Sequence, residues 1–392
     1  MSSPINAVLA HGGGPTAVIN ASLAGLVEQT RHNPNVRALY GAHFGVEGLL
    51  RAEFTDLLAL STSEIRAIGQ TPGSAIGSSR RNIGEQELER MIEIFRAHDV
   101  HQFFYTGGNG SMNTALRVHQ FARAATYDLT VIGIPKTIDN DLAVTDHTPG
   151  YGSTARFFAH AARDVGEDNR SLPSPICILE TLGRNAGWIV AATAFARRDE
   201  DDAPHLIYFP ERRVSLEHIA SDAARVSAKF GRCVIAVCEG QLDENGQPFG
   251  AAVDRPDVPQ HRLATNLGYT LARLLTEKTG LRARAEKPGL LGRCCGPFTS
   301  EIDRREAFEC GIAAARAAAE GQSGHMVALR RHSTEPYAAT TFLTALETVA
   351  LTERTMPAEW IGTESGAVSP EFLAWARPLV GEIAAYPRIR FR

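Results

Sequence analysis

Residues 135–141 read Pro-Lys-Thr-Ile-Asp-Asn-Asp and directly follow a short apolar segment, Leu129–Ile134. The apolar segment predicts a buried strand, and in α/β proteins ligands bind beyond the carboxyl ends of parallel strands. At such a place two carboxylates can bind Mg²⁺ or accept a proton, and a lysine can neutralise phosphate oxygens. These are the groups that phosphoryl transfer uses. A solvated turn rich in Asp and Asn has the same composition, so both interpretations stay open on this stretch alone.

Two further predicted strands run into glycine-rich turns. Ile5–Ala10 leads into His-Gly-Gly-Gly-Pro-Thr at 11–16, and Gln102–Tyr105 leads into Thr-Gly-Gly-Asn-Gly-Ser at 106–111. A helix is predicted after each turn, and this geometry directs backbone N–H groups and a helix N-terminus toward an anion. The first turn matches neither the P-loop nor the dinucleotide-binding fingerprint. Together they favour an α/β sheet with a phosphate site at its strand ends.

A loop of small residues, 71–81, ends in Arg80 and Arg81. Such a loop allows the backbone to approach a phosphate closely while the arginines bind its oxygens. A surface turn with solvated arginines is the alternative, and the sequence of the loop leaves both open.

The composition excludes several classes of protein. The 392 residues carry a net charge of −4, which provides no basic surface for nucleic acid, so anionic substrates must be met by local cations. No apolar run approaches the ~20 residues that span a bilayer. The six cysteines lack CxxC spacing and no signal peptide is recognised. We therefore expect a cytoplasmic protein with reduced thiols that binds neither nucleic acid nor membrane.

Six motifs give the chain a resemblance to the phosphofructokinases over most of its length. They are Gly-Gly-Gly-Pro-Thr at 12–16, Gly-Gly-Asn-Gly-Ser at 107–111, the stretch 135–141, Leu-Gly-Arg-Asn-Ala-Gly-Trp at 182–188, Glu239-Gly240, and the run from Arg284 through Gly289 to Arg293. Their order and spacing match the family. Residues 109–112, 148–153 and 347–387 are most similar to the short bacterial pyrophosphate-dependent branch.

The resemblance implies a fold of two doubly wound, Rossmann-like α/β domains with the active site in the cleft between them. We expect a donor-binding domain of residues 1–168 and about 265–325, and an acceptor-binding domain of residues 169–264. Residues 326–392 are expected to form a helical C-terminal segment that packs on both domains.

The resemblance also implies a role for each matched residue. The catalytic residues would be Asp139, as the general base, with Thr137, Lys136 and Arg293. The donor would be bound by Gly13, Gly108, Asn109, Gly110 and Arg80. The acceptor would be bound by Leu182, Gly183, Arg184, Glu239, Arg284 and Leu290. Mg²⁺ would be bound by Asn109 and Asp141.

The reaction implied is phosphoryl transfer from pyrophosphate to the C1 hydroxyl of fructose 6-phosphate, giving fructose 1,6-bisphosphate, in a homodimer or homotetramer. Three positions bear on the donor. Gly110 leaves room for ATP where pyrophosphate users usually carry Asp, whereas Lys136 is typical of pyrophosphate users. Thr114 replaces a glycine and would crowd a ribose. We therefore favour pyrophosphate and keep ATP as the alternative.

Other departures from the family pattern lie in the expected acceptor pocket. Pro175, Leu290 and Gly292 stand where many relatives carry polar side chains that bind the sugar phosphate. A kinase for a different hydroxyl compound is therefore a second hypothesis. Asn109 replaces an acid, and an amide is a weaker Mg²⁺ ligand than a carboxylate, so a ligand-binding relative without activity is a third. The intact Asp139 argues against the third.

Overall fold

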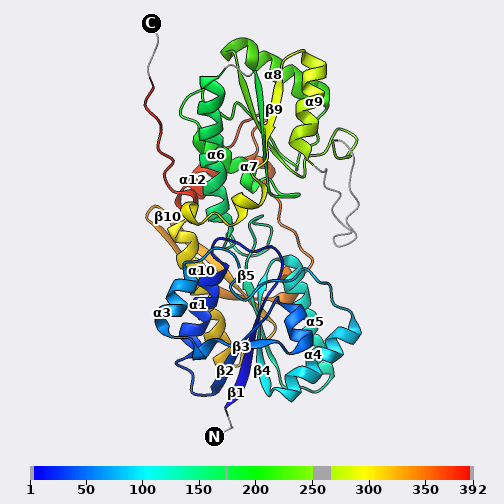
Figure 1. The fold of residues 1–392 in the computed structure, drawn as a ribbon, viewed down its shortest axis with the longest axis vertical. Coiled ribbons are helices and arrows are strands. Elements are labelled where there is room, and N and C mark those ends of the chain that lie inside the picture. The colour runs from blue at the N-terminus through cyan, green and yellow to red at the C-terminus, as the bar shows by residue number, and fades with distance from the viewer. Residues whose placement is uncertain (1–3, 173–174, 250–265, 389–392) are drawn as a thin grey trace. The chain divides into compact units, whose positions relative to one another are not determined.

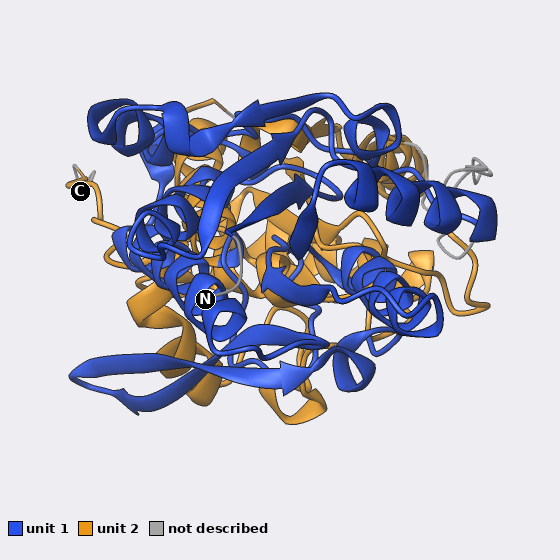
Figure 2. Cartoon of the chain, turned by 90° about the horizontal axis from the view of Figure 1, so that it is seen from below, with its two compact units in different colours: residues 1–151, 293–354 blue, residues 152–292, 355–392 orange. Residues whose placement is uncertain are grey.

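The computed structural model describes residues 4–172, 175–249 and 266–388. The chain divides into two compact units, which Figure 2 shows in separate colours. Unit 1 comprises residues 1–151 and 293–354, and unit 2 comprises residues 152–292 and 355–392. Both units are therefore assembled from segments that are distant in the sequence.

Unit 1 is built on a seven-stranded sheet with the strand order β11-β10-β5-β4-β1-β2-β3 (Figure 1). Its strands are β1 (Ile5–His11), β2 (Val36–Ala42), β3 (Phe54–Asp56), β4 (Val100–Gly107), β5 (Thr130–Pro135), β10 (His325–Thr334) and β11 (Tyr337–Ala345). The five central strands are parallel, and β3 and β11 are antiparallel edge strands. Because successive residues point to opposite faces of a sheet, Leu9 packs on one face and Val8 on the other.

Helices cover both faces of this sheet. One layer contains α1 (Ile19–Thr30), α3 (Thr62–Gly69) and α10 (Glu301–Ala319). The other contains α2 (Val46–Arg51), α4 (Glu85–Ala97), α5 (Asn109–Ala124) and α11 (Leu346–Val349). In α4 the buried residues Leu88, Met91 and Phe95 recur at the three- and four-residue spacing that places side chains on one face of a helix.

Unit 2 is built on four parallel strands in the order β7-β8-β6-β9. The strands are β6 (Ile176–Thr181), β7 (Leu206–Tyr208), β8 (Cys233–Cys238) and β9 (Ala283–Glu286). The helices are α6 (Tyr151–Ser171), α7 (Trp188–Ala192), α8 (Leu216–Phe230), α9 (Leu267–Thr279) and α12 (Pro370–Val380). Helices α8 and α9 cover one face of the sheet and α6 packs on the other. The α/β fold predicted from the sequence is therefore confirmed.

The remaining helices are short 3-10 segments: η1 (Leu57–Ala59), η2 (Thr193–Ala196), η3 (Gly289–Arg293), η4 (Gly296–Phe298) and η5 (Ala358–Trp360). Within the described ranges, none of the helices combines the length and the apolar character that a membrane crossing needs.

The unit boundaries differ from the domains expected from the sequence. Residues 152–168 belong to unit 2, because α6 continues through them and packs on the sheet of that unit. Residues 266–292 also belong to unit 2, because β9 pairs with β6. Residues 326–354 belong to unit 1, because β10 pairs with β5. The expected boundary near residue 265 lies outside the described residues.

The prediction of a helical C-terminal segment is wrong for residues 326–345. These residues form most of the β10–β11 hairpin, which begins with a buried run of Met-Val-Ala-Leu at 326–329. A short apolar run does not distinguish a buried strand from a helix by its periodicity. These residues form a strand because β10 pairs with β5, which is distant in the sequence.

Candidate active site

Three neighbouring parallel strands of unit 1 end at one edge of its sheet. The register pairs His11 of β1 with Thr106 of β4, and Gly107 of β4 with Pro135 of β5. The three motifs that follow these strands therefore begin side by side at the carboxyl edge. In an open α/β sheet this is the edge where ligands bind.

The first turn, residues 12–16, requires glycine at more than one position. A Cβ at Gly12 would lie 2.2 Å from Ser111 Oγ, and a Cβ at Gly107 of the neighbouring strand would lie 2.0 Å from the same atom. Gly13 has a φ of 78°, a conformation that glycine adopts without steric cost. The backbone of this turn is therefore free of side chains where an anion could approach it.

Three cationic side chains converge on this turn. Lys136 Nζ donates a hydrogen bond to Gly14 O at 2.6 Å. A Cβ at Gly14 would lie 2.9 Å from Arg293 Nη1 and 3.3 Å from Arg80 Nη2. A Cβ at Gly13 would lie 3.2 Å from Lys136 Nζ. An anion bound at Gly13 and Gly14 would therefore meet three positive charges.

Lys136 is buried, and the pKa of its ammonium group reflects this crowding. Burial lowers the pKa to about 8, and the charges of Arg293 and Arg80 act in the same direction, while Asp139 opposes them. Like charges raise the free energy of the protonated lysine. A polyanion bound among the three cations would relieve that repulsion.

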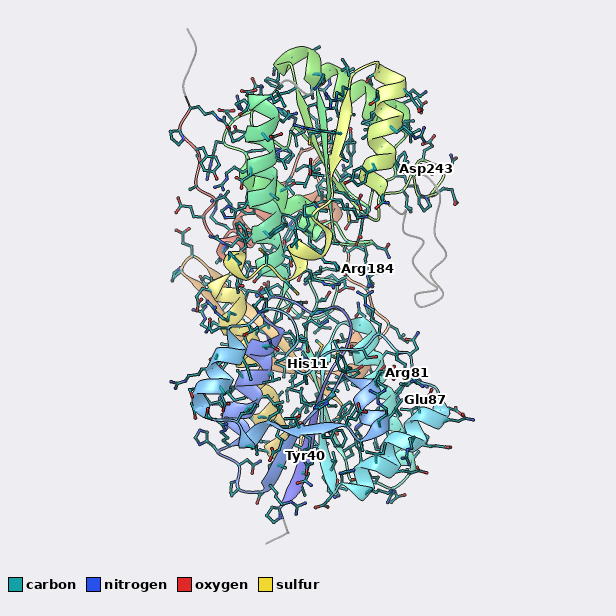
Figure 3. All side chains as sticks on the ribbon, viewed as in Figure 1. His11, Tyr40, Arg81, Glu87, Arg184 and Asp243 are labelled. Atoms are coloured by element: carbon teal, nitrogen blue, oxygen red, sulfur yellow. The ribbon has the colours of Figure 1, made fainter. Side chains whose placement is uncertain are left out.

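His11, labelled in Figure 3, is buried at the end of β1. Burial lowers the pKa of His11 to about 3, and the positive charge of Lys136 acts in the same direction. Its Nδ1 lies 2.8 Å from Ser74 Oγ. The imidazole is therefore neutral at physiological pH and adds no positive charge to the turn.

The two arginines of the loop 71–81 differ in their surroundings. Arg81 forms ion pairs with Glu47 and Glu87, each at 3.1 Å. Figure 3 labels Arg81 and Glu87. Arg80 lies beside Gly14, as described above. Only Arg80 of this pair is therefore a candidate ligand for an anion at the turn.

The turn after β5 joins Thr137 and Asp139 in one local unit. Asp139 N–H donates to Thr137 Oγ1 at 3.1 Å, and Thr137 N–H donates to Pro149 O at 3.3 Å. Asp139 is half-buried, and its negative charge favours the protonated form of Lys136. A carboxylate at this strand end can accept a proton from a hydroxyl group.

The second turn ends at the N-terminus of α5. Gly108 precedes the helix, and a Cβ there would lie 3.5 Å from Lys136 O. Gly110 is exposed, and apart from its chain neighbours and the backbone of α5 no described atom lies within 4 Å of a Cβ built on it. The free N–H groups at the start of a helix favour a bound anion, so this turn can contribute to the site that the first turn begins.

Asn109 and Asp141 offer a pair of oxygen ligands. Asn109 Nδ2 donates to Asp141 Oδ2 at 3.1 Å. In the part of the chain that the structure describes, neither Asn109 Oδ1 nor Asp141 Oδ1 has a hydrogen-bond partner, although both atoms are shielded from solvent. Among the same residues no cluster of three or more His, Cys, Asp or Glu could hold a metal ion. The pair therefore fits a cation such as Mg²⁺, which is usually bound by one or two carboxylates together with substrate phosphates and water.

In unit 2, the motifs 182–184 and 239–240 meet at the carboxyl ends of β6 and β8. Glu239 N–H donates to Thr181 O at 2.9 Å, and a Cβ at Gly240 would lie 1.7 Å from Arg184 O. Burial raises the pKa of the Glu239 carboxyl, and the nearby charge of Arg184 opposes that rise. Arg184 itself has a left-handed φ of 52°, which is uncommon outside glycine and concentrates at functional sites.

Glu180 and Lys287 belong to the same group of charges, and the sequence did not identify Glu180 as a site residue. Lys287 Nζ lies 2.7 Å from Glu180 Oε1, and Gly268 N–H donates to Glu180 Oε2 at 2.7 Å. Both charges act on the pKa of Glu239. The available signal was an acid near the end of an apolar strand, which the sequence shows at Glu180 as well as at Glu239.

Arg284 and Leu290 have other surroundings. Arg284 lies within β9, and its guanidinium pairs with Asp168 of α6 at 2.5 Å. Lys287, which follows the end of β9, pairs with Glu180 as described above. Leu290 lies in η3 and is 67% exposed. The expectation that both residues bind the acceptor therefore stays a prediction.

Comparisons with known proteins place the chain in a family. The family model described as phosphofructokinase matches residues 6–318. The chain belongs to the phosphofructokinase family. It is 40% identical to a pyrophosphate–fructose 6-phosphate 1-phosphotransferase of Rhodospirillum rubrum, over 95% of this chain and 94% of the relative. It is 34% identical to a sulfofructose kinase of Alkalicoccus urumqiensis, over 84% of this chain and 85% of the relative.

Solved structures support the same assignment. The crystal structure of a pyrophosphate-dependent phosphofructokinase from Nitrosospira multiformis superposes with a TM-score of 0.87 at 32% identity, covering 98% of this chain and 94% of that one. At this identity the likeness extends beyond the fold alone, and it agrees with the resemblance recognised from the six motifs.

One departure from the phosphofructokinase pattern has a packing explanation. A Cβ at Gly292 would lie 2.5 Å from Phe158 Cε2 and 3.1 Å from Phe157 Cδ1. Both rings belong to α6. The aromatic side chains of α6 therefore occupy the space that a polar side chain at position 292 would need. No comparable contact explains Pro175 or Leu290.

Proposed function

We propose that this protein is a pyrophosphate-dependent 6-phosphofructokinase, which transfers a phosphoryl group from pyrophosphate to the C1 hydroxyl of fructose 6-phosphate. The products are fructose 1,6-bisphosphate and phosphate. One observation carries the proposal: Lys136, Arg80 and Arg293 converge on the turn of Gly13 and Gly14, and Lys136 also interacts with the charge of Asp139, in a member of this family. The pyrophosphate named for the Rhodospirillum rubrum relative is a polyanion that suits such a site.

The three cations would bind the donor and stabilise its transition state. Phosphoryl transfer depends mainly on positioning and on neutralising charge on the transferring oxygens. Arg293 and Lys136 would meet those oxygens, while Gly13, Gly108, Asn109 and Gly110 would line the donor site with backbone groups. Because these groups are held by surrounding structure, little reorganisation is needed as charge develops.

Asp139 would act as the general base. It would take the proton of the C1 hydroxyl as the oxygen bonds to phosphorus, while the bridging P–O bond of pyrophosphate breaks and phosphate leaves. Thr137, whose Oγ1 accepts the Asp139 N–H, would hold the base in position. Such a base contributes typically ~10²–10⁴-fold to the rate.

Asp141 and Asn109 would hold Mg²⁺ through the two oxygens that lack a partner among the described residues. When bound, the ion would supply positive charge next to the donor's oxygens. The acceptor would bind at the strand ends of unit 2, on Arg184, Glu239, Leu182 and Gly183, and further on Arg284 and Leu290. We also propose a homodimer or homotetramer in the cytoplasm.

A kinase for another hydroxyl compound is the second candidate. It is favoured by the exposure of Leu290 at 67% and by Pro175, since neither side chain can bind a phosphate. The sulfofructose kinase relative shows that the family includes other substrates. ATP as donor remains the alternative for the first half of the reaction, because Gly110 leaves its surroundings open.

A panel of substrates tests these proposals. The protein is incubated with Mg²⁺, with pyrophosphate or ATP, and with fructose 6-phosphate or a set of other sugar phosphates and polyols, and new phosphoesters are detected by ³¹P NMR. We expect turnover with pyrophosphate and fructose 6-phosphate, and a loss of ~10²–10⁴-fold in kcat for Asp139→Asn. The exposed Asp128→Asn is the matched control. Turnover with ATP alone, or with another acceptor alone, would replace the proposal with the corresponding alternative.

A further inference from the structure

Residues 140–150 form a loop whose position determines where two of the proposed site residues lie. The loop begins directly after Asp139 and contains Asp141. Asn140 has a left-handed φ of 55°, and its Oδ1 accepts the N–H of Thr148 at 2.9 Å. The two ends of the loop are therefore tied together, and its orientation depends on what holds its far side.

His147 holds that far side through two carboxylates. Its Nδ1 lies 2.8 Å from Asp146 Oδ1 and its Nε2 lies 2.6 Å from Glu306 Oε2. The side chain is 1% exposed, so water does not compete for these contacts. Ionised carboxylates only accept hydrogen bonds. Both ring nitrogens must then carry a hydrogen, and the ring is an imidazolium.

Further charges surround this cluster. Glu306 Oε1 accepts the Tyr337 hydroxyl at 2.5 Å, and Asp146 Oδ1 accepts Arg331 Nε at 3.0 Å. Arg354 Nη1 donates to Asp146 O at 2.8 Å. Asp141 and Tyr151 interact electrostatically with Arg354, and Cys310 lies near the charges of Glu306, Glu309 and Asp303. The imidazolium therefore lies between two acids, with two arginines on the side of Asp146.

Helix α10 connects this cluster to the donor turn. Glu306 belongs to α10, as does Asp303, whose Oδ1 accepts the N–H of Gly150 at 2.8 Å. The same helix packs closely on α1, which follows the first glycine turn: a Cβ at Gly311 would lie 2.0 Å from Ser22 O. One helix thus supports both the loop 140–150 and the helix behind the donor turn.

We propose that His147, held as an imidazolium between Asp146 and Glu306, is a positioning residue that fixes the loop 140–150 against α10. Through that loop it keeps Asp139 and Asp141 in place. The effect on catalysis rests on the proposed function, whereas the charge of the ring and the order of the loop do not.

The charge state predicts how the loop responds to pH. Burial alone would lower the pKa of His147, but the hydrogen bonds to Asp146 and Glu306 raise it to about 9. A histidine whose pKa is higher in the folded than in the unfolded state contributes stability that is complete below about pH 6.5 and is lost as the pH rises through the folded value. The loop should therefore loosen toward about pH 9.

The first test does not require activity. In protein labelled with ¹⁵N-histidine, we expect one ring with two slowly exchanging N–H protons at neutral pH and an ionisation near pH 9. The ring is assigned with His147→Gln. Hydrogen exchange of the amides in residues 140–150 should be at least about tenfold faster in His147→Gln, while circular dichroism stays unchanged. The exposed His32→Gln is the matched control.

The second test separates positioning from a merely structural role. Glu306→Gln removes one of the two negative charges, so the pKa of His147 should fall and the alkaline limb of kcat should move to lower pH. We expect kcat to fall about tenfold in His147→Gln, with KM for each substrate changed less than about twofold and the limb near pH 9 abolished.

A neutral ring at pH 7, or an unchanged pH profile and unchanged hydrogen exchange in Glu306→Gln, would overturn the proposal. If His147→Gln does not fold, the Glu306→Gln variant and the histidine ring N–H signals of the wild type still test the proposal. If no substrate pair is turned over, the proposed function fails while the ring signals and hydrogen exchange continue to test this inference.

Discussion

The strand ends of the two units carry different charge arrangements. In unit 1, three cations converge on one glycine turn. In unit 2, Arg184 lies near the half-buried Glu239, and Lys287 pairs with the buried Glu180. An excess of positive charge suits a polyanion, whereas carboxylates balanced by cations suit a ligand with several hydroxyl groups. The same α/β architecture thus offers two kinds of recognition, set by the residues at the strand ends.

Matched substitutions of one lysine in each unit have the largest expected effects, and they test whether the two units bind different substrates. We expect Lys136→Gln to lower kcat by ~10²–10³-fold, because a preorganised charge at the transferring phosphoryl is lost. Lys287→Gln should instead raise KM for fructose 6-phosphate roughly tenfold, the effect of about 1.4 kcal/mol, and leave KM for pyrophosphate unchanged. Steady-state kinetics with each substrate varied separately measure both. Equal effects of the two variants on both substrates would contradict the assignment of pyrophosphate to unit 1 and fructose 6-phosphate to unit 2.

Proton uptake on pyrophosphate binding tests the cationic site of unit 1. The pKa of Lys136 is lowered to about 8, and a bound polyanion would raise it. At about pH 8.5 the free protein carries a partly deprotonated lysine, so binding of pyrophosphate should take up a proton. Calorimetry in two buffers of different ionisation enthalpy measures this uptake. It should be absent for Lys136→Gln and for fructose 6-phosphate binding to the wild type.

The smallest expected effect concerns stability in unit 2. We expect Gly292→Gln to lower the free energy of unfolding by about 1–3 kcal/mol, because the new side chain would displace Phe158. Leu290→Gln, at an exposed position of the same 3-10 helix, should change it by less than about 0.5 kcal/mol. Urea unfolding measures both. A stable Gly292→Gln that also lowers KM for fructose 6-phosphate would show that packing does not explain the glycine.

The sequence and the structure agree where the signals are local. Buried strands followed by glycine-rich or acidic turns were recognised from short patterns of apolar, small and charged residues, because those patterns depend on residues a few positions apart. The hairpin of residues 326–345 was not recognised, since its short apolar run is compatible with either a helix or a strand until β5 pairs with it. The same limit applies to Arg284, whose motif was recognised although its pairing with Asp168 was not.

The amino-acid sequence by itself determined the α/β class, the glycine turns and the placement of Lys136, Asp139 and Asp141 after a buried strand. Only the tertiary structure decided which distant groups join them. His147 and Glu306 are 159 residues apart in the chain and 2.6 Å apart in the fold. The physical reason is that hydrophobic periodicity and turn chemistry are local, whereas a buried charge acquires its partner only when separate elements pack and exclude water.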